Sequence, residues 1–259
     1  MINTFEALSN GYAENMPIDM KFASSQEGTS ISPAPPSKRH PYDQWSPDAR
    51  ALDLVGDKWT LLIVRDLAGG PRRFVELQRT LPGISTEQLR SRLNRMVADG
   101  LLTRQRYREV PPRVDYELTP RSRALLPVVS ELARWGYEYA WGDPRPGERV
   151  DIGAVMRAAT GLHLPLSLRG LVDAIVIHPE KGELRYALRV QDGGLRYSEH
   201  PAVEAQARVR GPERAWVEAF GPSGSRTELE FEGDQQLARA VLDAVQDRAA
   251  SSNGARHAA

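Results

Sequence analysis

The 259-residue sequence contains no cysteine. This absence excludes disulfide bonds, thiolate metal ligands, cysteine nucleophiles and thiol-based redox sensing. The sequence also lacks any run of about 20 consecutive apolar residues, which a membrane-spanning helix requires. Its first thirty residues do not contain the apolar core of a signal peptide. We therefore expect a soluble, cytoplasmic protein.

The sequence also lacks net charge, since 34 basic residues balance 34 acidic ones. Taken as a whole, this balance argues against a nucleic-acid-binding protein. The charge is uneven, however: residues 38–142 hold 18 basic and 13 acidic residues, a net charge of +5, whereas residues 1–37 carry −3 and residues 143–259 carry −2. Six arginines lie between positions 85 and 108. Such a cluster is typical of a phosphate-binding surface. Charge alone does not distinguish it from a solvent-exposed basic surface without a ligand.

Length and composition predict two folded domains. Hydrophobic residues make up 41% of the chain and charged residues 26%, which is ordinary for globular proteins. Proline and serine dominate the end of the first segment, and prolines and glycines interrupt the chain again near position 145. The predicted organisation is a disordered tail (1–40), a first domain (41–141), a linker (142–150), a second domain (151–248) and a disordered tail (249–259).

Three short helices are predicted at the start of the first domain. Ser46 followed by Pro47 is a typical helix start, because the serine can cap free backbone N–H groups and proline suits the first turn. Asp57 is placed to cap a second helix over 58–68. Apolar residues at positions i, i+3 and i+7 predict a third helix over 74–81, followed by a Pro-Gly turn.

The fourth helix has the clearest predicted start in the chain. Ser85 and Gln88 form a capping box, and Ile84 can pack on Leu89 as a hydrophobic staple. We expect this helix to end at Gly100. Its apolar stripe consists of Leu89, Leu93, Met96 and Val97, while Glu87, Gln88, Ser91, Asn94 and Arg95 face outward and Arg90 and Arg92 lie on the flanks.

Two strands follow the fourth helix, over 102–108 and 114–119. A hairpin after a helix-turn-helix is a wing, and the second helix of that motif lies in the major groove of DNA. Thr119 and Pro120 predict the start of a last helix that reaches Trp141. Its apolar positions are Leu125, Val128, Val129, Leu132, Trp135 and Tyr139.

The first domain resembles the HxlR-type winged helix-turn-helix transcriptional regulators of bacteria. The resemblance implies a homodimer, paired through the first and last helices of this domain, that binds an inverted-repeat operator on double-stranded DNA. Several family members carry a sensing cysteine just before the first helix, where this chain has Ser46, so that mode of induction is excluded. The motifs are Ala51-Leu-Asp-Leu-Val-Gly-Asp-Lys-Trp-Thr-Leu-Leu-Ile-Val-Arg-Asp66, Gly70-Pro-Arg-Arg-Phe74, Leu81-Pro-Gly-Ile-Ser85, Asp99-Gly-Leu101 and Val114-Asp-Tyr-Glu-Leu-Thr119.

Thirteen residues are candidates for DNA contact because their side chains can bond phosphates or base edges. Trp59 is assigned to the core instead, since an aromatic residue at this spacing usually packs inside. The sequence does not separate the residues that read bases from those that grip phosphate. The candidates are Lys58, Arg72 and Arg73 for phosphate; Ser85, Thr86, Gln88, Ser91, Arg92 and Arg95 on the fourth helix; and Arg104, Arg106, Arg108 and Arg113 on the wing. For base reading we favour Thr86, Gln88, Ser91, Arg92 and Arg95.

The second domain is predicted to be α+β, so the fold class is α+β: a winged helix-turn-helix followed by a mixed α+β domain. Its last part resembles the sterol carrier protein type-2-like fold through Val209-Arg-Gly-Pro-Glu-Arg-Ala-Trp216 and Leu229-Glu-Phe-Glu-Gly-Asp234. The predicted helices cover 151–160, 212–220 and 234–248. The predicted strands cover 174–178, 183–190, 195–198, 204–210 and 228–232.

This second resemblance implies an apolar tunnel that holds a hydrophobic small-molecule effector. A filled core that only adds dimer surface is the alternative, and a lipid carrier whose winged helix serves for dimerisation is the alternative function. The five histidines show no metal-ligand spacing, and the chain has neither a nucleophile motif nor a glycine-rich phosphate loop. We therefore expect no enzyme activity, no metal, no cofactor and no membrane partner.

Overall fold

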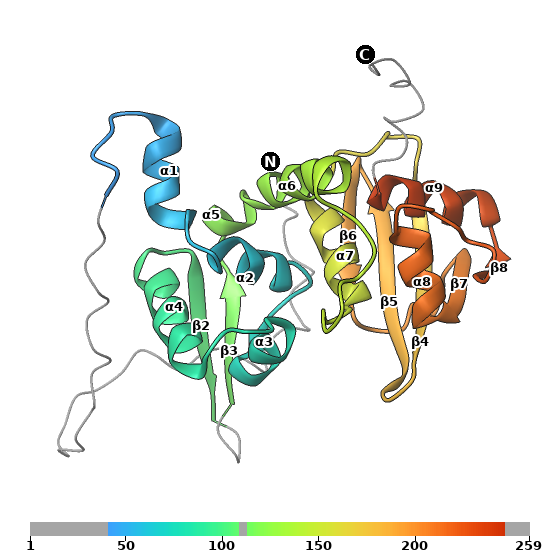
Figure 1. Ribbon diagram of the computed structural model, residues 1–259, viewed down its shortest axis with the longest axis horizontal. Coiled ribbons are helices and arrows are strands. Elements are labelled where there is room, and N and C mark those ends of the chain that lie inside the picture. Colours follow the sequence, from blue (N-terminus) through green and yellow to red (C-terminus); the bar gives the residue numbers. More distant parts are fainter. Residues whose placement is uncertain (1–40, 109–112, 247–259) are drawn as a thin grey trace, which may run out of the picture. The chain divides into compact units, whose positions relative to one another are not determined.

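The structure is a computed structural model that describes residues 41–108 and 113–246 (Figure 1). The predicted tails (1–40 and 249–259) and the turn of the predicted wing (109–112) lie outside the described residues. All described residues belong to one compact unit. Their buried apolar side chains form two clusters, one between Val55 and Val129 and the other between Ile152 and Val245.

Helices α1 (Pro47–Val55), α2 (Thr60–Asp66) and α3 (Phe74–Thr80) build the first part of the fold. The Ser46 Oγ accepts a hydrogen bond from the Ala49 N–H at 3.3 Å, so Ser46 caps α1 as predicted. The Asp57 carboxylate accepts hydrogen bonds from the N–H groups of Trp59 and Thr60. The regular helix therefore begins only at Thr60. The predicted start at Lys58 is therefore two residues too early.

Helix α4 (Thr86–Ala98) begins as the sequence predicts. The Ser85 Oγ accepts from the Gln88 N–H, and the Gln88 Oε1 accepts from the Ser85 N–H, both at 3.1 Å. Leu89, Leu93 and Met96 are buried, and Gly100 follows the helix with a φ of +68° that suits glycine. The capping box and the apolar stripe are thus confirmed.

A three-stranded sheet in the order β1-β3-β2 completes the winged helix-turn-helix. Strands β2 (Leu102–Tyr107) and β3 (Arg113–Leu118) pair in antiparallel fashion and confirm the predicted wing strands. The two-residue strand β1 (Arg72–Arg73) was not predicted, because its only signal is a long-range pairing with Tyr116 and Asp115. The α+β class and the winged helix-turn-helix are therefore confirmed.

The predicted single helix from Thr119 to Trp141 is wrong in one respect, because it is broken into α5 (Pro120–Arg123) and α6 (Leu126–Tyr139). Thr119 caps α5 through a hydrogen bond from the Ser122 N–H. Pro127 lies in the first turn of α6 and has no N–H to continue the α5 ladder. The break therefore follows from the proline, which the apolar periodicity does not register.

The second half is a five-stranded sheet with helices on one face. Its strands are β4 (Gly170–His178), β5 (Gly182–Gln191), β6 (Gly194–Ser198), β7 (Ala207–Pro212) and β8 (Glu230–Gly233), in the order β6-β5-β4-β7-β8, with β4 and β7 parallel. The helices are α7 (Ile152–Ala158), the 3₁₀ turn η1 (Ala159–Gly161), α8 (Glu213–Phe220) and α9 (Gln235–Val245). The elements match the prediction, but β4 begins four residues earlier and β7 three residues later than expected.

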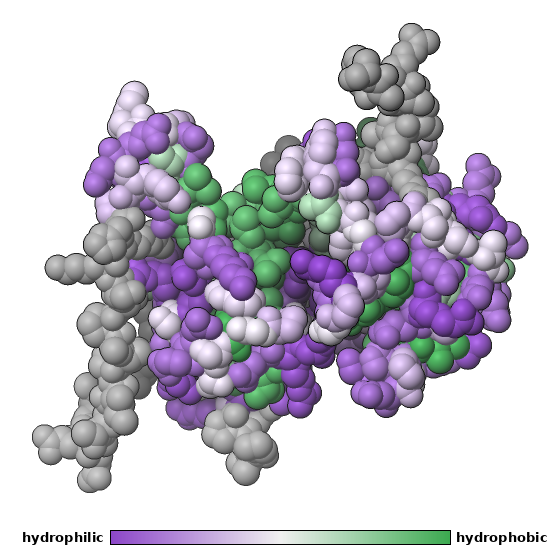
Figure 2. Space-filling model, viewed as in Figure 1, coloured by the Kyte–Doolittle hydropathy of each residue, from purple (hydrophilic) through white to green (hydrophobic). Residues whose placement is uncertain are grey.

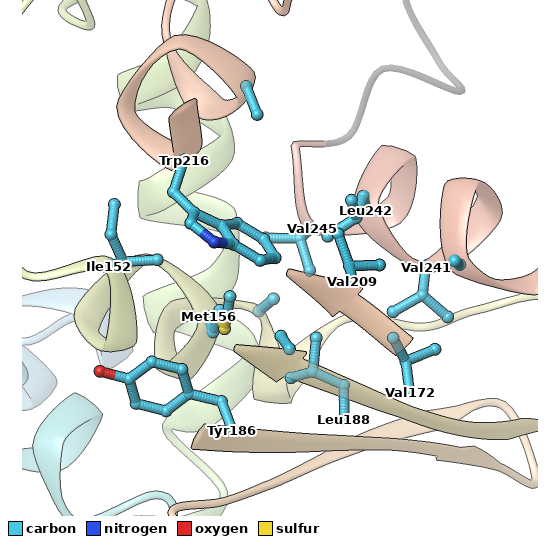
Figure 3. Close-up of a cluster of buried hydrophobic side chains, with 14 of the residues drawn as sticks. Ile152, Met156, Val172, Tyr186, Leu188, Val209, Trp216, Val241, Leu242 and Val245 are labelled. Carbon is cyan, nitrogen blue, oxygen red and sulfur yellow. The ribbon is translucent and has the colours of Figure 1, made fainter. Parts of the chain in front are cut away.

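Large side chains occupy the space between this sheet and its helices (Figure 3). Met156 of α7, Leu188 of β5 and Trp216 of α8 are all fully buried. The Trp216 indole N–H is satisfied by the Ile175 carbonyl at 3.1 Å. This packing favours the filled-core alternative over the predicted apolar tunnel, while the resemblance to sterol carrier proteins stays a prediction.

Candidate nucleic-acid interface

The outward side of α4 is polar and accessible. Thr86, Glu87, Gln88, Arg90 and Ser91 are exposed, and the helix packs its opposite side into the first apolar cluster. The Arg90 guanidinium is 2.8 Å from the Glu87 carboxylate, which lowers the free cationic charge of this surface. The accessible N-terminal half is the part of a recognition helix that contacts base edges.

Two of the predicted base-reading side chains already have partners within the protein. The Thr86 Oγ1 accepts a hydrogen bond from the Gln78 amide at 2.7 Å. The Gln88 Oε1 accepts from the Ser85 N–H, so a bidentate contact of Gln88 with adenine would have to break the capping box. Ser91, by contrast, is exposed at the centre of the outward side.

Arg92 does not lie free on the flank of α4. Its guanidinium is 3.0 Å from the Asp57 carboxylate, the same group that caps the start of α2. The side chain is partly buried, and its ion pair with Asp57 connects α4 to the start of α2. Arg95 is also partly buried. Arg92 therefore forms an ion pair within the protein, and its contact with bases stays a prediction.

Of the three residues predicted to bind phosphate near the first helices, Arg72 is the least accessible. Its side chain is only 12% exposed and pairs with Glu199 of the second half. Arg73, the next residue of β1, points to the other face and is exposed, 3.9 Å from Asp115. Lys58 is exposed, with its Nζ 4.9 Å from the centre of the Trp59 ring. Trp59 packs against the first cluster, as predicted.

The wing carries a group of exposed cations. Arg104 and Arg106 on β2, and Arg108 just after it, are exposed, and none has a carboxylate within 4.0 Å among the described residues. Arg113 differs from them, because it bonds Asp115 through two nitrogens and lies 4.8 Å from the Tyr107 ring centre. Arg113 therefore has an acidic partner within the protein, and its contact with DNA stays a prediction.

The structure also contains a buried ionic cluster that the sequence reasoning missed. Arg157 of α7, only 2% exposed, is 3.3 Å from Asp66 of α2, 2.8 Å from Asp151 and 2.8 Å from Glu199. It also donates to the Tyr197 hydroxyl. The one available signal is that Arg157 directly follows Met156 on the apolar side of α7. The cluster joins α2 of the winged helix to the second half.

Electrostatics keep Arg157 charged. Burial disfavours the charged form of Arg157, but Tyr197 and the carboxylates of Asp151, Asp66 and Glu199 outweigh it and raise the pKa of Arg157 above its ordinary value. Burial likewise raises the pKa of the Tyr197 hydroxyl, which stays protonated and donates to Glu199 at 2.8 Å. Arg157 is thus a permanent cation at the centre of the cluster.

The part of the chain that the structure describes holds no helix long and apolar enough to cross a membrane. Among the same residues, no three histidine or acidic side chains are grouped closely enough to hold a metal ion.

Comparison with known proteins places the first half among regulators. A family model described as HxlR-like helix-turn-helix matches residues 54–143. HTH-type transcriptional regulator BH0655 of Halalkalibacterium halodurans is 43% identical over 94 residues, which are 36% of this chain and 83% of that protein. YkvN of Bacillus subtilis, another HTH-type transcriptional regulator, is 38% identical over 37% of this chain and 81% of its own length. The solved structure of the reduced transcriptional regulator YodB from B. subtilis is 33% identical, covers 40% of this chain and 99% of its own, and has a TM-score of 0.34.

Proposed function

The chain belongs to the HxlR-like helix-turn-helix family, and from this premise we propose that it is a transcriptional regulator that binds double-stranded DNA as a homodimer. The observation that carries this proposal is the wing, where Arg104, Arg106 and Arg108 are exposed without carboxylate partners among the described residues. Unpaired arginines beside a polar recognition helix are suited to a phosphate backbone or a minor groove. The protein then acts by binding and not by catalysis.

Within this proposal, α4 enters the major groove with its N-terminal half. Ser91 is an exposed base-reading side chain, and Thr86, Gln88 and Arg95 contact bases by exchanging their internal partners for DNA. Ser85 and the exposed Lys58 and Arg73 contact phosphates. Arg72, Arg92 and Arg113 support the surface from within, since each is held by a carboxylate.

The dimer is supported by an apolar stripe on α6. Val128, Leu132, Trp135 and Tyr139 recur at spacings of 4, 3 and 4 and are 49%, 52%, 56% and 64% exposed. Figure 2 shows hydrophobic surface gathered beside α6. An exposed apolar stripe of this length marks an interaction site, and Leu52 of α1 and Trp45 before it add to the exposed apolar surface. A two-fold dimer through this surface would present two recognition helices to an inverted repeat.

Sequencing the genomic DNA fragments that the purified protein retains tests the proposed function. The expected result is an enriched inverted repeat with half-site centres about 10 base pairs, or a multiple of that, apart. The matched control is a variant with Ser91→Glu and Arg106→Glu, which places acidic charge on α4 and the wing and is expected to retain no enriched sequence. Retention without any common sequence, or the same enrichment by the control, would contradict a sequence-specific regulator.

We further propose that the second half, residues 151–248, is a regulatory domain. The filled cluster around Trp216 favours this role over a lipid carrier, because a carrier needs an internal space for its cargo. The cluster around Arg157 supplies the physical connection, since it holds Asp66 of α2 and, through Glu199, Arg72 of β1.

A further inference from the structure

The outer face of the five-stranded sheet, opposite its helices, is strongly charged but mostly neutralised. Arg185 is 3.3 Å from Asp173, and Arg208 is 3.4 Å from the same carboxylate. Arg208 also pairs with Glu232, and Arg210 pairs with Glu183 at 3.0 Å. Arg185, Arg208 and Arg210, which lie in the central part of this face, therefore each have an acidic partner.

Two arginines at the β5–β6 end of the same face differ from this pattern. Arg189 and Arg196 are exposed and directly opposite each other in the β5–β6 register. Leu188 and Val190 on one strand and Leu195 and Tyr197 on the other point into the apolar cluster, so the two guanidinium groups share the outer face. Neither arginine has a carboxylate within 4.0 Å among the described residues. Like charges directly opposite in a sheet are destabilising, so this pair favours an anion between them.

A depression of about 530 Å³ lies beside this pair. Its cationic and polar lining includes Arg189, Arg196, His200 and Ser198, and Glu204 is its one acidic lining residue. Its apolar lining includes Leu171, Ala202 and Val203. The volume is in the range of sites that hold small molecules, which combine apolar walls with a few convergent polar groups.

We propose that this depression binds a small organic anion with an apolar body, whose carboxylate or phosphate group lies between Arg189 and Arg196. A guanidinium fork bonds a carboxylate or phosphate through two parallel N–H donors, and two opposed forks bind one such group from both sides. The apolar body lies against Leu171, Ala202 and Val203. This site differs from an internal tunnel, because it is on the open face of the sheet.

The same segment connects the depression to the winged helix. Ser198 and His200 line the depression, and Glu199 between them points to the other side, where it binds Arg157 and Arg72. A ligand that orders residues 198–200 therefore acts on the residue that holds Arg72 of β1. The effect of the ligand on DNA binding rests on the proposed function, whereas the binding of the anion does not.

Isothermal titration calorimetry on the full chain tests the site with three probes: sodium octanoate, 1-octanol as its neutral counterpart, and inorganic phosphate. We expect octanoate to bind once per chain, octanol not to bind, and phosphate to bind at least tenfold more weakly than octanoate. The substitutions Arg189→Gln/Arg196→Gln should lower the affinity for octanoate at least tenfold. The control Arg214→Gln/Arg239→Gln removes the same charge from the same half and should stay within twofold of the wild type.

Several results would overturn the site. One is that octanol or phosphate binds as tightly as octanoate. Another is that none of the probes binds. A third is that both double variants change the affinity for octanoate by the same factor. Because the two arginines are exposed and repel each other, the variants are expected to melt at or above the wild-type temperature. The single variant Arg196→Lys keeps the positive charge but loses the guanidinium group, so it should bind octanoate with an intermediate affinity. This variant replaces the double variant in the test if the double variant does not fold.

A second measurement tests the connection to DNA. Octanoate should change the affinity of the wild-type protein for its operator by about fivefold or more. The variant Glu199→Gln should bind octanoate as the wild type does but lose this effect. An unchanged effect in Glu199→Gln would contradict the connection. A wild-type protein that binds octanoate but no DNA would contradict the proposed function and leave the anion site standing.

Discussion

Replacing Arg157 with alanine is expected to lower the free energy of unfolding by about 3–5 kcal/mol. The substitution removes a guanidinium that is within 4.0 Å of Asp66, Asp151 and Glu199, and Asp66 is fully buried. A buried carboxylate without its cation keeps its desolvation cost and loses the compensating attraction. Asp66 retains only Arg65, at 2.9 Å, as a charged neighbour among the described residues. Urea unfolding monitored by circular dichroism measures the loss.

The control for this prediction is Arg145→Ala. Arg145 forms an equally short pair with Glu148, but its side chain is 83% exposed, so water replaces the lost contact and no measurable change is expected. The double variant Arg157→Met/Asp66→Leu should recover most of the stability, because it removes the buried charge together with its partner. A loss in Arg157→Ala as small as that in the control would contradict the structural role of the cluster.

The double substitution Leu132→Glu/Trp135→Glu is expected to convert the proposed dimer to a monomer and to weaken operator binding by about 100-fold or more. Both side chains lie in the middle of the exposed apolar stripe of α6, where a carboxylate would be buried without a partner in the dimer. A monomer contacts only one half-site, so it loses the gain of two linked binding events, which is about 10²–10⁴ in affinity. Light scattering gives the oligomeric state, and fluorescence anisotropy gives the affinity.

The matched control for the dimer is Leu166→Glu, which places a carboxylate on an exposed leucine outside the stripe. It should leave both mass and affinity unchanged. A wild-type protein that is monomeric at micromolar concentration, or a stripe variant that remains dimeric, would contradict the proposed dimer surface.

Local rules predict most of the winged helix because its signals lie close together in the chain. The capping box of Ser85 and Gln88 is one example, since both partners lie within one turn of the helix. Strand β1 could not be predicted, because two residues form a strand only through pairing with β3 some 40 positions away. The break before α6 was missed because the apolar periodicity continues through Pro127.

The roles of individual arginines were the least predictable part of the candidate site. The sequence identifies residues with the right chemistry for DNA, but not the carboxylates that already hold them. Arg72 pairs with Glu199, which is 127 positions away, and Arg92 pairs with Asp57, 35 positions away. The pairs of Arg157 with Asp66 and with Glu199 are also long-range, 91 and 42 positions apart, and no local pattern encodes them. The wing arginines retain their predicted role as proposals because the described residues offer them no such partner.

The most direct test of the DNA-binding surface is the salt dependence of operator binding by the wild type and by the variant Arg104→Gln/Arg106→Gln/Arg108→Gln. A dimer that neutralises about six to eight phosphates should give a slope of log K against log salt of about −5 to −7. The wing variant removes six cations from the dimer and should make the slope shallower by about 5. The control Arg145→Gln/Arg214→Gln/Arg239→Gln should keep the wild-type slope. A flat slope for the wild type, or equal slopes for the two triple variants, would contradict binding through the wing.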